Sequence, residues 1–168
     1  MRLFSLVEET ALPGGALLQE FTDRGEYTDC FVARIENTVT FPTYVETFYT
    51  TRLFRLERLI LKWLISRPSS DEQARRLSRN ETDSFAAWKE YRRSDDQLVM
   101  MDFRQQTCSW FMLGSDENGT RLYFGSAVML DEDESSARKM KWTYRALLGF
   151  HRLYSRALLQ AAARRLRH

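Results

Sequence analysis

Residues 141–167 read KWTYRALLGFHRLYSRALLQAAARRLR and carry the longest helical pattern in the chain. Only Gly149 interrupts it. Mostly apolar side chains recur every three or four residues and so share one side of a helix: Tyr144, Leu147, Leu148, His151, Tyr154, Ser155, Leu158, Leu159, Ala162 and Leu166. Phe150, Leu153 and Ala157 widen that side. The sequence therefore predicts a long helix, from Lys141 to about Arg167, that is largely buried and wrapped by other elements.

Strand patterns fill the stretch before this helix. Residues 85–93, 98–104, 107–113 and 120–130 alternate in polarity or are rich in β-branched and aromatic side chains, so each is predicted to be a strand. Asn118-Gly119 favours a tight turn between the last two strands. Gly125, inside the last strand, indicates a bulge or a sharp bend. These strands are the expected covering of the terminal helix.

The first half of the chain reads as one strand followed by helices. Residues 27–35 predict the strand. Residues 42–65 predict two helices or one bent helix, ending before Pro68. Ser69 and Glu72 have capping-box spacing at the start of a third, short helix, with a stop at Asn80. Residues 1–26 are predicted to be irregular, apart from an apolar run at 3–7 that could add an edge strand.

Length and composition predict a single soluble domain spanning residues 1–168. Of the 168 residues, 43% are hydrophobic and 13% aromatic, and the net charge is only +2. That near balance argues against a nucleic-acid-binding protein. No stretch has the length and apolarity of a membrane span or a secretory signal. Cys30 and Cys108 are isolated and make no disulfide framework, so we expect a cytoplasmic protein.

The order of strand, helices, antiparallel strands and long terminal helix resembles the helix-grip fold (the SRPBCC superfamily). This group includes START domains, plant pathogenesis-related allergens and bacterial polyketide-cyclase-like proteins. The resemblance covers residues 27–166 and is clearest from Asp96 through ALLGFHRLYSRALL (146–159). It implies an α+β fold in which a curved antiparallel β-sheet grips the C-terminal helix. Two or three short helices are expected between the first and second main strands.

The same resemblance implies a cavity between sheet and helix, which in this group often holds an apolar ligand. One departure concerns residues 69–83, where the group usually has two further strands. This segment is polar and helical in pattern here, so about five strands are expected.

His151 is the sharpest candidate for chemistry, because it lies on the apolar side of the terminal helix near Tyr154. It could act as a general acid or base, or anchor a ligand. The alternative is a buried histidine hydrogen-bonded to a strand backbone or to a carboxylate. Asp102 lies in the apolar run LVMMDFR, where a carboxylate needs a partner. It could accept a proton from His151 or orient a ligand. The alternatives are an ion pair with Arg92 or Arg121, or an exposed sheet edge.

Aromatic side chains supply candidates for a ligand pocket. Trp110 and Phe124 are predicted to contact the ligand together with His151 and Tyr154, with ordinary core packing as the alternative. Cys108 shares a strand face with Trp110 and reads as a small core residue, because nothing in the sequence places a base beside it.

Three functions follow as hypotheses. The leading one is binding of an apolar or aromatic small molecule between sheet and terminal helix. The second is a cyclase- or dehydratase-type enzyme that uses His151 and Asp102 as acid and base. The third is a non-catalytic interaction module, such as a homodimer, that uses the apolar face of residues 53–64. No metal site and no cofactor are predicted, since the chain has no GxGxxG, P-loop, GxSxG or HExxH motif.

Overall fold

The computed structural model describes residues 7–129 and 137–167 and has an α+β fold. The strands are β1 (Val7–Glu9), β2 (Tyr27–Ile35), β3 (Ser84–Phe85), β4 (Trp88–Arg93), β5 (Gln97–Asp102), β6 (Thr107–Asp116) and β7 (Gly119–Val128). The helices are α1 (Gln19–Asp23), α2 (Phe41–Tyr49), α3 (Arg52–Ile65), α4 (Asp71–Ser78) and α5 (Ala137–Leu166). Of the predicted edge strand at 3–7, only Val7 belongs to the described residues.

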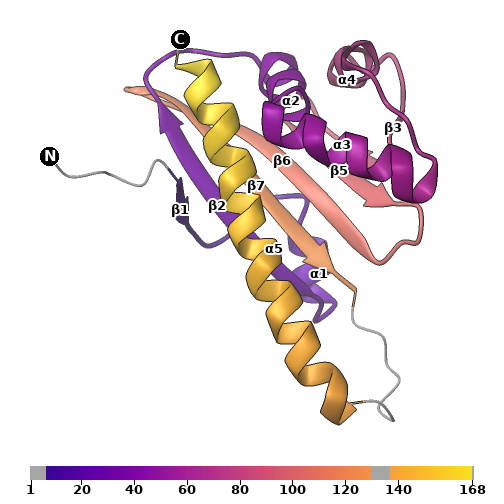
Figure 1. The fold of residues 1–168 in the computed structure, drawn as a ribbon. Coiled ribbons are helices and arrows are strands. Elements are labelled where there is room, and N and C mark those ends of the chain that lie inside the picture. Colours follow the sequence, from indigo (N-terminus) through magenta and orange to yellow (C-terminus); the bar gives the residue numbers. More distant parts are fainter. Residues whose placement is uncertain (1–6, 130–136, 168) are drawn as a thin grey trace, which may run out of the picture.

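All strands join one curved antiparallel sheet in the order β1-β2-β7-β6-β5-β4-β3. The first long strand, β2, therefore pairs with the last strand, β7, and α2, α3 and α4 lie between β2 and β3 in sequence. Figure 1 shows α5 running diagonally across the face of the sheet that also carries α2 and α3. This architecture confirms the predicted fold class and is compatible with a helix-grip arrangement.

The strand count differs from the expected five because two short edge strands are present. Residues 85–93 do not form one strand: Phe85 pairs with Trp88 in a hairpin between β3 and β4. The turn contains Ala86 at φ 52°, a left-handed conformation that alanine rarely adopts. Composition alone did not indicate a turn there.

Side-chain caps define the helix starts. The Thr40 side chain accepts from the backbone N–H of Thr43 at the start of α2, and Thr51 caps α3 in the same way. The break at Thr50-Thr51 thus separates two helices. At α4 the capping box is formed by Ser70 and Gln73, one residue later than the predicted Ser69 and Glu72.

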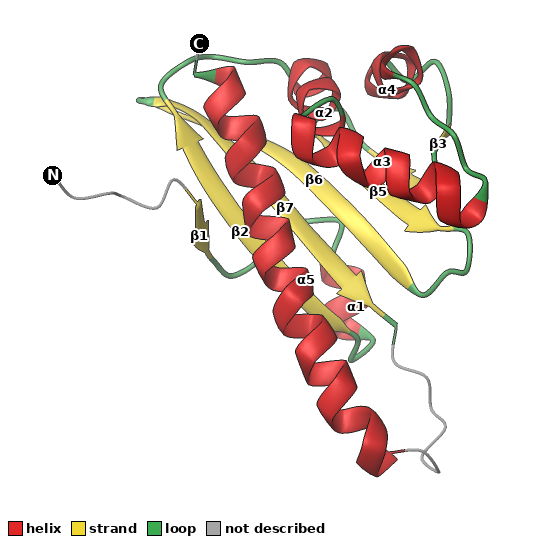
Figure 2. Cartoon of the chain, in the orientation of Figure 1, coloured by secondary structure: helices red, strands yellow, loops and turns green. Residues whose placement is uncertain are grey.

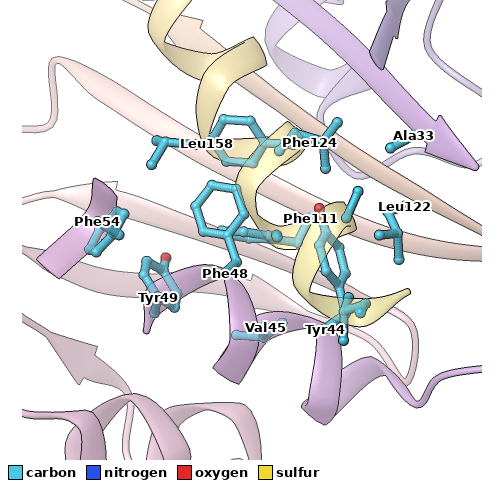
Figure 3. Close-up of a cluster of buried hydrophobic side chains, with 14 of the residues drawn as sticks. Ala33, Tyr44, Val45, Phe48, Tyr49, Phe54, Phe111, Leu122, Phe124 and Leu158 are labelled. Atoms are coloured by element: carbon cyan, nitrogen blue, oxygen red, sulfur yellow. The ribbon is translucent and has the colours of Figure 1, made fainter. Parts of the chain in front are cut away.

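Aromatic rings fill the space between α2 and the sheet (Figure 3). The ring centroid of Phe48 lies 4.6 Å from that of Phe124 and 4.8 Å from that of Phe111. Tyr44 is fully buried and donates its hydroxyl to the carbonyl of Tyr123 at 2.9 Å, which fixes α2 on β7. This part of the interior is closed by the protein's own side chains.

A second apolar cluster covers the opposite face of the sheet. Trp110 is fully buried there and packs with Leu18 and Phe21 of the α1 region. The Gln97 side chain accepts from the Trp110 indole N–H (2.9 Å) and the Leu17 backbone N–H (2.8 Å), and it donates to the carbonyl of Gly15 (3.0 Å). Of the segment before β2, the described residues hold the short elements β1 and α1 in otherwise irregular chain, and these contacts fasten it to the sheet.

The described side chains of the terminal helix are less buried than predicted. Those that are buried lie in its C-terminal half: Ser155, Leu158, Leu159, Ala162, Ala163 and Leu166. Phe150 is 69% exposed and Leu153 is 72% exposed. Figure 2 shows the N-terminal part of α5 extending past the end of the sheet, where no strand can cover it. The side chains of Tyr144, Leu147 and Leu148 lie outside the described residues.

Candidate functional site around His151

A chain of three polar side chains joins the sheet to α5. Asp29 Oδ1 accepts the backbone N–H of Ser126 at 2.9 Å and its hydroxyl at 2.6 Å. Ser126 Oγ lies 2.6 Å from Nε2 of His151, which is itself 4.0 Å from Asp29 Oδ2. Tyr27 donates its hydroxyl to Asp29 Oδ2 at 3.4 Å. The three groups form one continuous hydrogen-bonded chain.

Strand register explains why Asp29 and Ser126 meet. They are direct partners across β2 and β7, and Phe31 faces Phe124 two residues further along. Since side chains alternate along a strand, all four lie on the face that α5 covers. The sheet thus presents an aromatic zone followed by a polar one, and His151 lies over the polar zone.

The proton positions depend on the state of Asp29. When its carboxylate is ionised it can only accept, so the single hydroxyl proton of Ser126 is donated to Asp29. His151 Nε2 must then carry a proton and donate it to Ser126 Oγ. A serine nucleophile requires the reverse, with the imidazole accepting the hydroxyl proton. In this state the imidazole is a hydrogen-bond donor to Ser126, and Ser126 is not activated as a nucleophile.

Burial differs sharply along the chain of groups. The Asp29 side chain is 1% exposed, whereas that of His151 is 33% exposed. Burial raises the pKa of the Asp29 carboxyl, although hydrogen bonds from Ser126 and the His151 charge oppose the shift. His151 is thus the member that a molecule from solvent can reach.

Tyr154 lies one turn beyond His151 and joins α5 to α3. Its hydroxyl donates to Glu57 of α3, and its ring is stacked with that of Phe150 at an interplanar angle of 5°. Burial raises the pKa of Glu57, and the hydrogen bond from Tyr154 only partly offsets this. Burial, together with the Glu57 charge, also raises the pKa of Tyr154.

The structure brings three of the four predicted ligand contacts to the α5 side of the sheet: Phe124, His151 and Tyr154. Phe124 is 4% exposed and belongs to the core described above. Trp110 lies apart from them, because its neighbour Phe111 takes the α5-facing position on β6 and the indole enters the opposite cluster. Trp110 therefore lies on the other face of the sheet from the remaining three predicted ligand contacts.

Asp102 does not meet His151. It ends β5, which is separated from β7 by β6, so two strand spacings of about 10 Å in total lie between their strands. Its carboxylate accepts from the Gln106 backbone N–H at 2.8 Å and the Thr107 hydroxyl at 3.2 Å, within the β5–β6 turn. The carboxylate beside His151 is Asp29.

Sequence reasoning missed Asp29 and Ser126. Asp29 carried the same signal as Asp102, a lone carboxylate in an apolar strand, but only the β2–β7 register shows which of the two faces α5. Ser126 had no signal of its own, since a serine on a strand is ordinary.

A hollow of about 300 Å³ lies at the other end of the sheet, lined by Arg34, Ile35, Glu36, Asn118, Thr120 and Arg167. It adjoins the end of α5, where Asn37 donates to the carbonyl of Leu166 at 2.9 Å. These polar contacts fasten the last turn of the helix, and the hollow is remote in sequence and register from His151.

Comparisons with known proteins add little. No family model and no curated protein matches the chain. Among solved structures, the crystal structure of CalU16 from Micromonospora echinospora is similar at 12% identity, covering 94% of this chain and 91% of that one, with a TM-score of 0.33. A similarity this low carries no argument about fold or function, so the topology stands on the chain's own pairing.

Among residues 7–129 and 137–167, no group of three or more His, Cys, Asp or Glu side chains is placed to hold a metal ion. Within the same residues, no helix has the length and apolarity needed to cross a membrane.

Proposed function

We propose that the protein binds a small molecule with an apolar or aromatic body on the α5 side of the sheet, with His151 contacting a polar group of the ligand. The chain from Asp29 through Ser126 to His151 carries this proposal. A buried carboxylate beside an aromatic core costs desolvation free energy. Ionisable groups whose pKa is shifted by burial concentrate at functional sites. Here the hydrogen-bonded series from Asp29 ends at the His151 imidazole, which is open to solvent.

The surroundings supply a mixed lining for such a ligand. Ser109 is the register partner of Ser126 on β6, and Val128 follows two residues after Ser126 on the same face; both are half-buried. Tyr154 stands one helical turn from His151 and is also half-buried. A ligand placed here would meet apolar surface on one side and hydrogen-bonding groups on the other.

Titration with anilinonaphthalene sulfonate, an anionic aromatic probe, tests the proposal. We expect saturable binding that weakens about tenfold in His151→Ala, a change equivalent to about 1.4 kcal/mol. Trp63→Ser, which removes an exposed aromatic ring elsewhere, should leave the affinity unchanged. The backbone amide of Ser126 should shift in NMR spectra on binding. Shifts confined to α3, or no saturable binding, would contradict the proposal.

A second candidate function is acid–base catalysis of the cyclase or dehydratase type. The direction of the hydrogen bonds favours it: Nε2 of His151 is held by Ser126, so Nδ1 is the ring atom that can exchange a proton with a substrate. Asp29 then takes the role first given to Asp102 and stabilises the imidazolium. Turnover in a panel of cyclisation and dehydration substrates should disappear in His151→Gln and persist in Asp102→Asn. Equal turnover in wild type and His151→Gln contradicts this role.

A further inference from the structure

The exposed apolar side chains are concentrated on one part of the molecule. Among the described residues, seven of the eight exposed large hydrophobic side chains lie on α3, on α5 or in the turn after β5. Those on the two helices form what we call the outer patch: Leu56, Leu59, Ile60, Trp63, Phe150 and Leu153. Trp63 is the most exposed of them, at 77%. Such a concentration on a monomer marks an interaction surface.

The α3 side chains of the patch do not take part in the packed core. Leu56, Leu59, Ile60 and Trp63 repeat at the spacing of one helix face. An amphipathic helix of a globular protein usually turns its apolar face toward the core. Here α3 packs through Phe54 and Arg58 instead, both of which are buried. Arg58 is fixed by ion pairing with Asp71 at 2.6 Å and by the Ser69 hydroxyl at 3.0 Å. The apolar stripe is left facing solvent.

The α5 part lies beside it. Figure 1 shows both helices over the same face of the sheet. The hydrogen bond between Glu57 and Tyr154 joins them, and the Phe150 ring is stacked with the Tyr154 ring at a centroid distance of 6.1 Å. The outer surfaces of α3 and α5 therefore form one side of the molecule.

The charge around the patch is positive. Arg52 and Lys62 are exposed on α3, whereas Arg55, also exposed, is ion-paired with Asp71. Arg67 follows the helix with its guanidinium 5.3 Å from the Phe103 ring centroid. Glu57, the acidic residue of α3, is turned inward toward Tyr154. An anionic partner is the electrostatic complement.

We propose that the outer patch docks the protein onto an anionic lipid surface. Apolar and aromatic side chains flanked by arginine and lysine are the composition of helices that lie in a membrane interface. In Figure 2, α3 and α5 run in different directions, so one straight partner helix would cover only one stripe, whereas a fluid surface can meet both. A second copy of the chain would bring two cationic α3 helices together, which is unfavourable.

Co-sedimentation with vesicles tests the proposal. We expect binding to phosphatidylcholine–phosphatidylglycerol vesicles at low salt, with little binding to pure phosphatidylcholine and a loss at high salt. Leu59→Asp and Trp63→Ser should each weaken partitioning about tenfold or more. Since these side chains face solvent, both variants should keep the wild-type circular dichroism spectrum and melting temperature.

Charge variants provide the matched control. Lys62→Glu should weaken binding to the anionic vesicles, while Lys89→Glu, the same change on an exposed residue of β4, should not. If both variants lost vesicle binding equally, the effect would come from the net charge of the protein, and the patch assignment would be overturned. Failure of the wild type to bind vesicles, or a dimer mass in sedimentation equilibrium that Leu59→Asp abolishes, would also overturn it, the latter in favour of a second copy.

Discussion

Gly125 shows how much one residue position depends on its neighbours. β7 keeps a continuous register with both β2 and β6 through this residue, so of the predicted bulge or sharp bend, the bulge is wrong. A Cβ at this position would lie 2.5 Å from the backbone oxygen of Asp29, 3.0 Å from Leu18 and 3.1 Å from Trp110. Glycine is required because backbone and side chains approach closely on the face that carries the second cluster.

Replacing this glycine should destabilise the protein. We expect Gly125→Ala to lower the free energy of unfolding by about 1–3 kcal/mol, because the added methyl group forces β2 or Trp110 to move. Gly149→Ala is the matched control: a Cβ there meets nothing within 4 Å, and alanine should stabilise the α5 helix by about 0.5–1 kcal/mol. Urea denaturation measures both changes. A Gly125→Ala variant with the wild-type free energy of unfolding would contradict the close approach of the Asp29 backbone to this position.

At the scale of the site residues, the sequence predicted His151 and Tyr154 because a helix has a fixed period. It could not choose between Asp29 and Asp102, because that choice depends on strand pairing between segments about a hundred residues apart. Trp110 was misplaced for the same reason: a one-residue shift in the inward face exchanges it with Phe111. Short-range patterns identify side chains worth attention, and register decides which of them meet.

Among the secondary-structure elements, the segment before β2 depends on a single buried amide. Gln97 is 7% exposed, and its side chain makes three hydrogen bonds that hold residues 15–17 and the Trp110 indole. Tyr91 of β4 adds an outer contact by donating to Glu20 of α1 at 2.7 Å. No sequence period predicts this segment, because its order comes from a partner far along the chain.

We expect Gln97→Leu to cost about 2–4 kcal/mol of unfolding free energy, since it leaves the Leu17 N–H and the Trp110 indole N–H buried without an acceptor. Limited proteolysis should then cut within residues 10–25 before the rest of the sheet opens. Gln73→Ala, which removes an exposed capping-box partner, should cost at most about 1 kcal/mol and leave the cleavage pattern unchanged. Wild-type protease resistance in Gln97→Leu would show that apolar packing alone orders the segment.

The start of α2 was predicted well, within one residue of Phe41, where the Thr40 side chain caps the helix. The orientation of α3 was not predicted, because the sequence shows its apolar stripe but not the contacts that hold the opposite side of the helix against the protein. Those contacts come from Phe54, which packs into the aromatic core, and Arg58, which reaches Asp71. The contacts of these two residues, and not burial of the apolar stripe, determine the orientation of α3.

For the molecule as a whole, buried carboxyl groups set part of the pH dependence of stability. Burial raises the pKa values of both Asp29 and Glu57 in the folded protein. A group whose folded pKa is raised contributes its stability fully below its unfolded pKa, about 4 for these residues, and loses it as the pH rises through the folded pKa. These two groups therefore favour folding in acid and oppose it at neutral pH.

Glu57→Gln should consequently raise the free energy of unfolding at pH 7, by about 1 kcal/mol, because the amide oxygen still accepts the Tyr154 hydroxyl and no buried charge remains. The gain should shrink as the pH is lowered and vanish below about pH 4. Glu72→Gln, an exposed residue with 62% side-chain exposure, is the control and should change little. Guanidinium melts across this pH range measure the difference, and a Glu57→Gln variant that is less stable at pH 7 would contradict the assigned sign.

The sheet of this molecule ends in very short strands, with three residues in β1 and two in β3. Unpaired strand edges are the templates on which chains add to one another and start amyloid growth. Over the described residues these end strands offer only a short template, and β1 carries Glu8 and Glu9, whose charges disfavour stacking. Addition of strands to β1 or β3 thus has little to begin from in the folded state, so aggregation by this route should require prior unfolding.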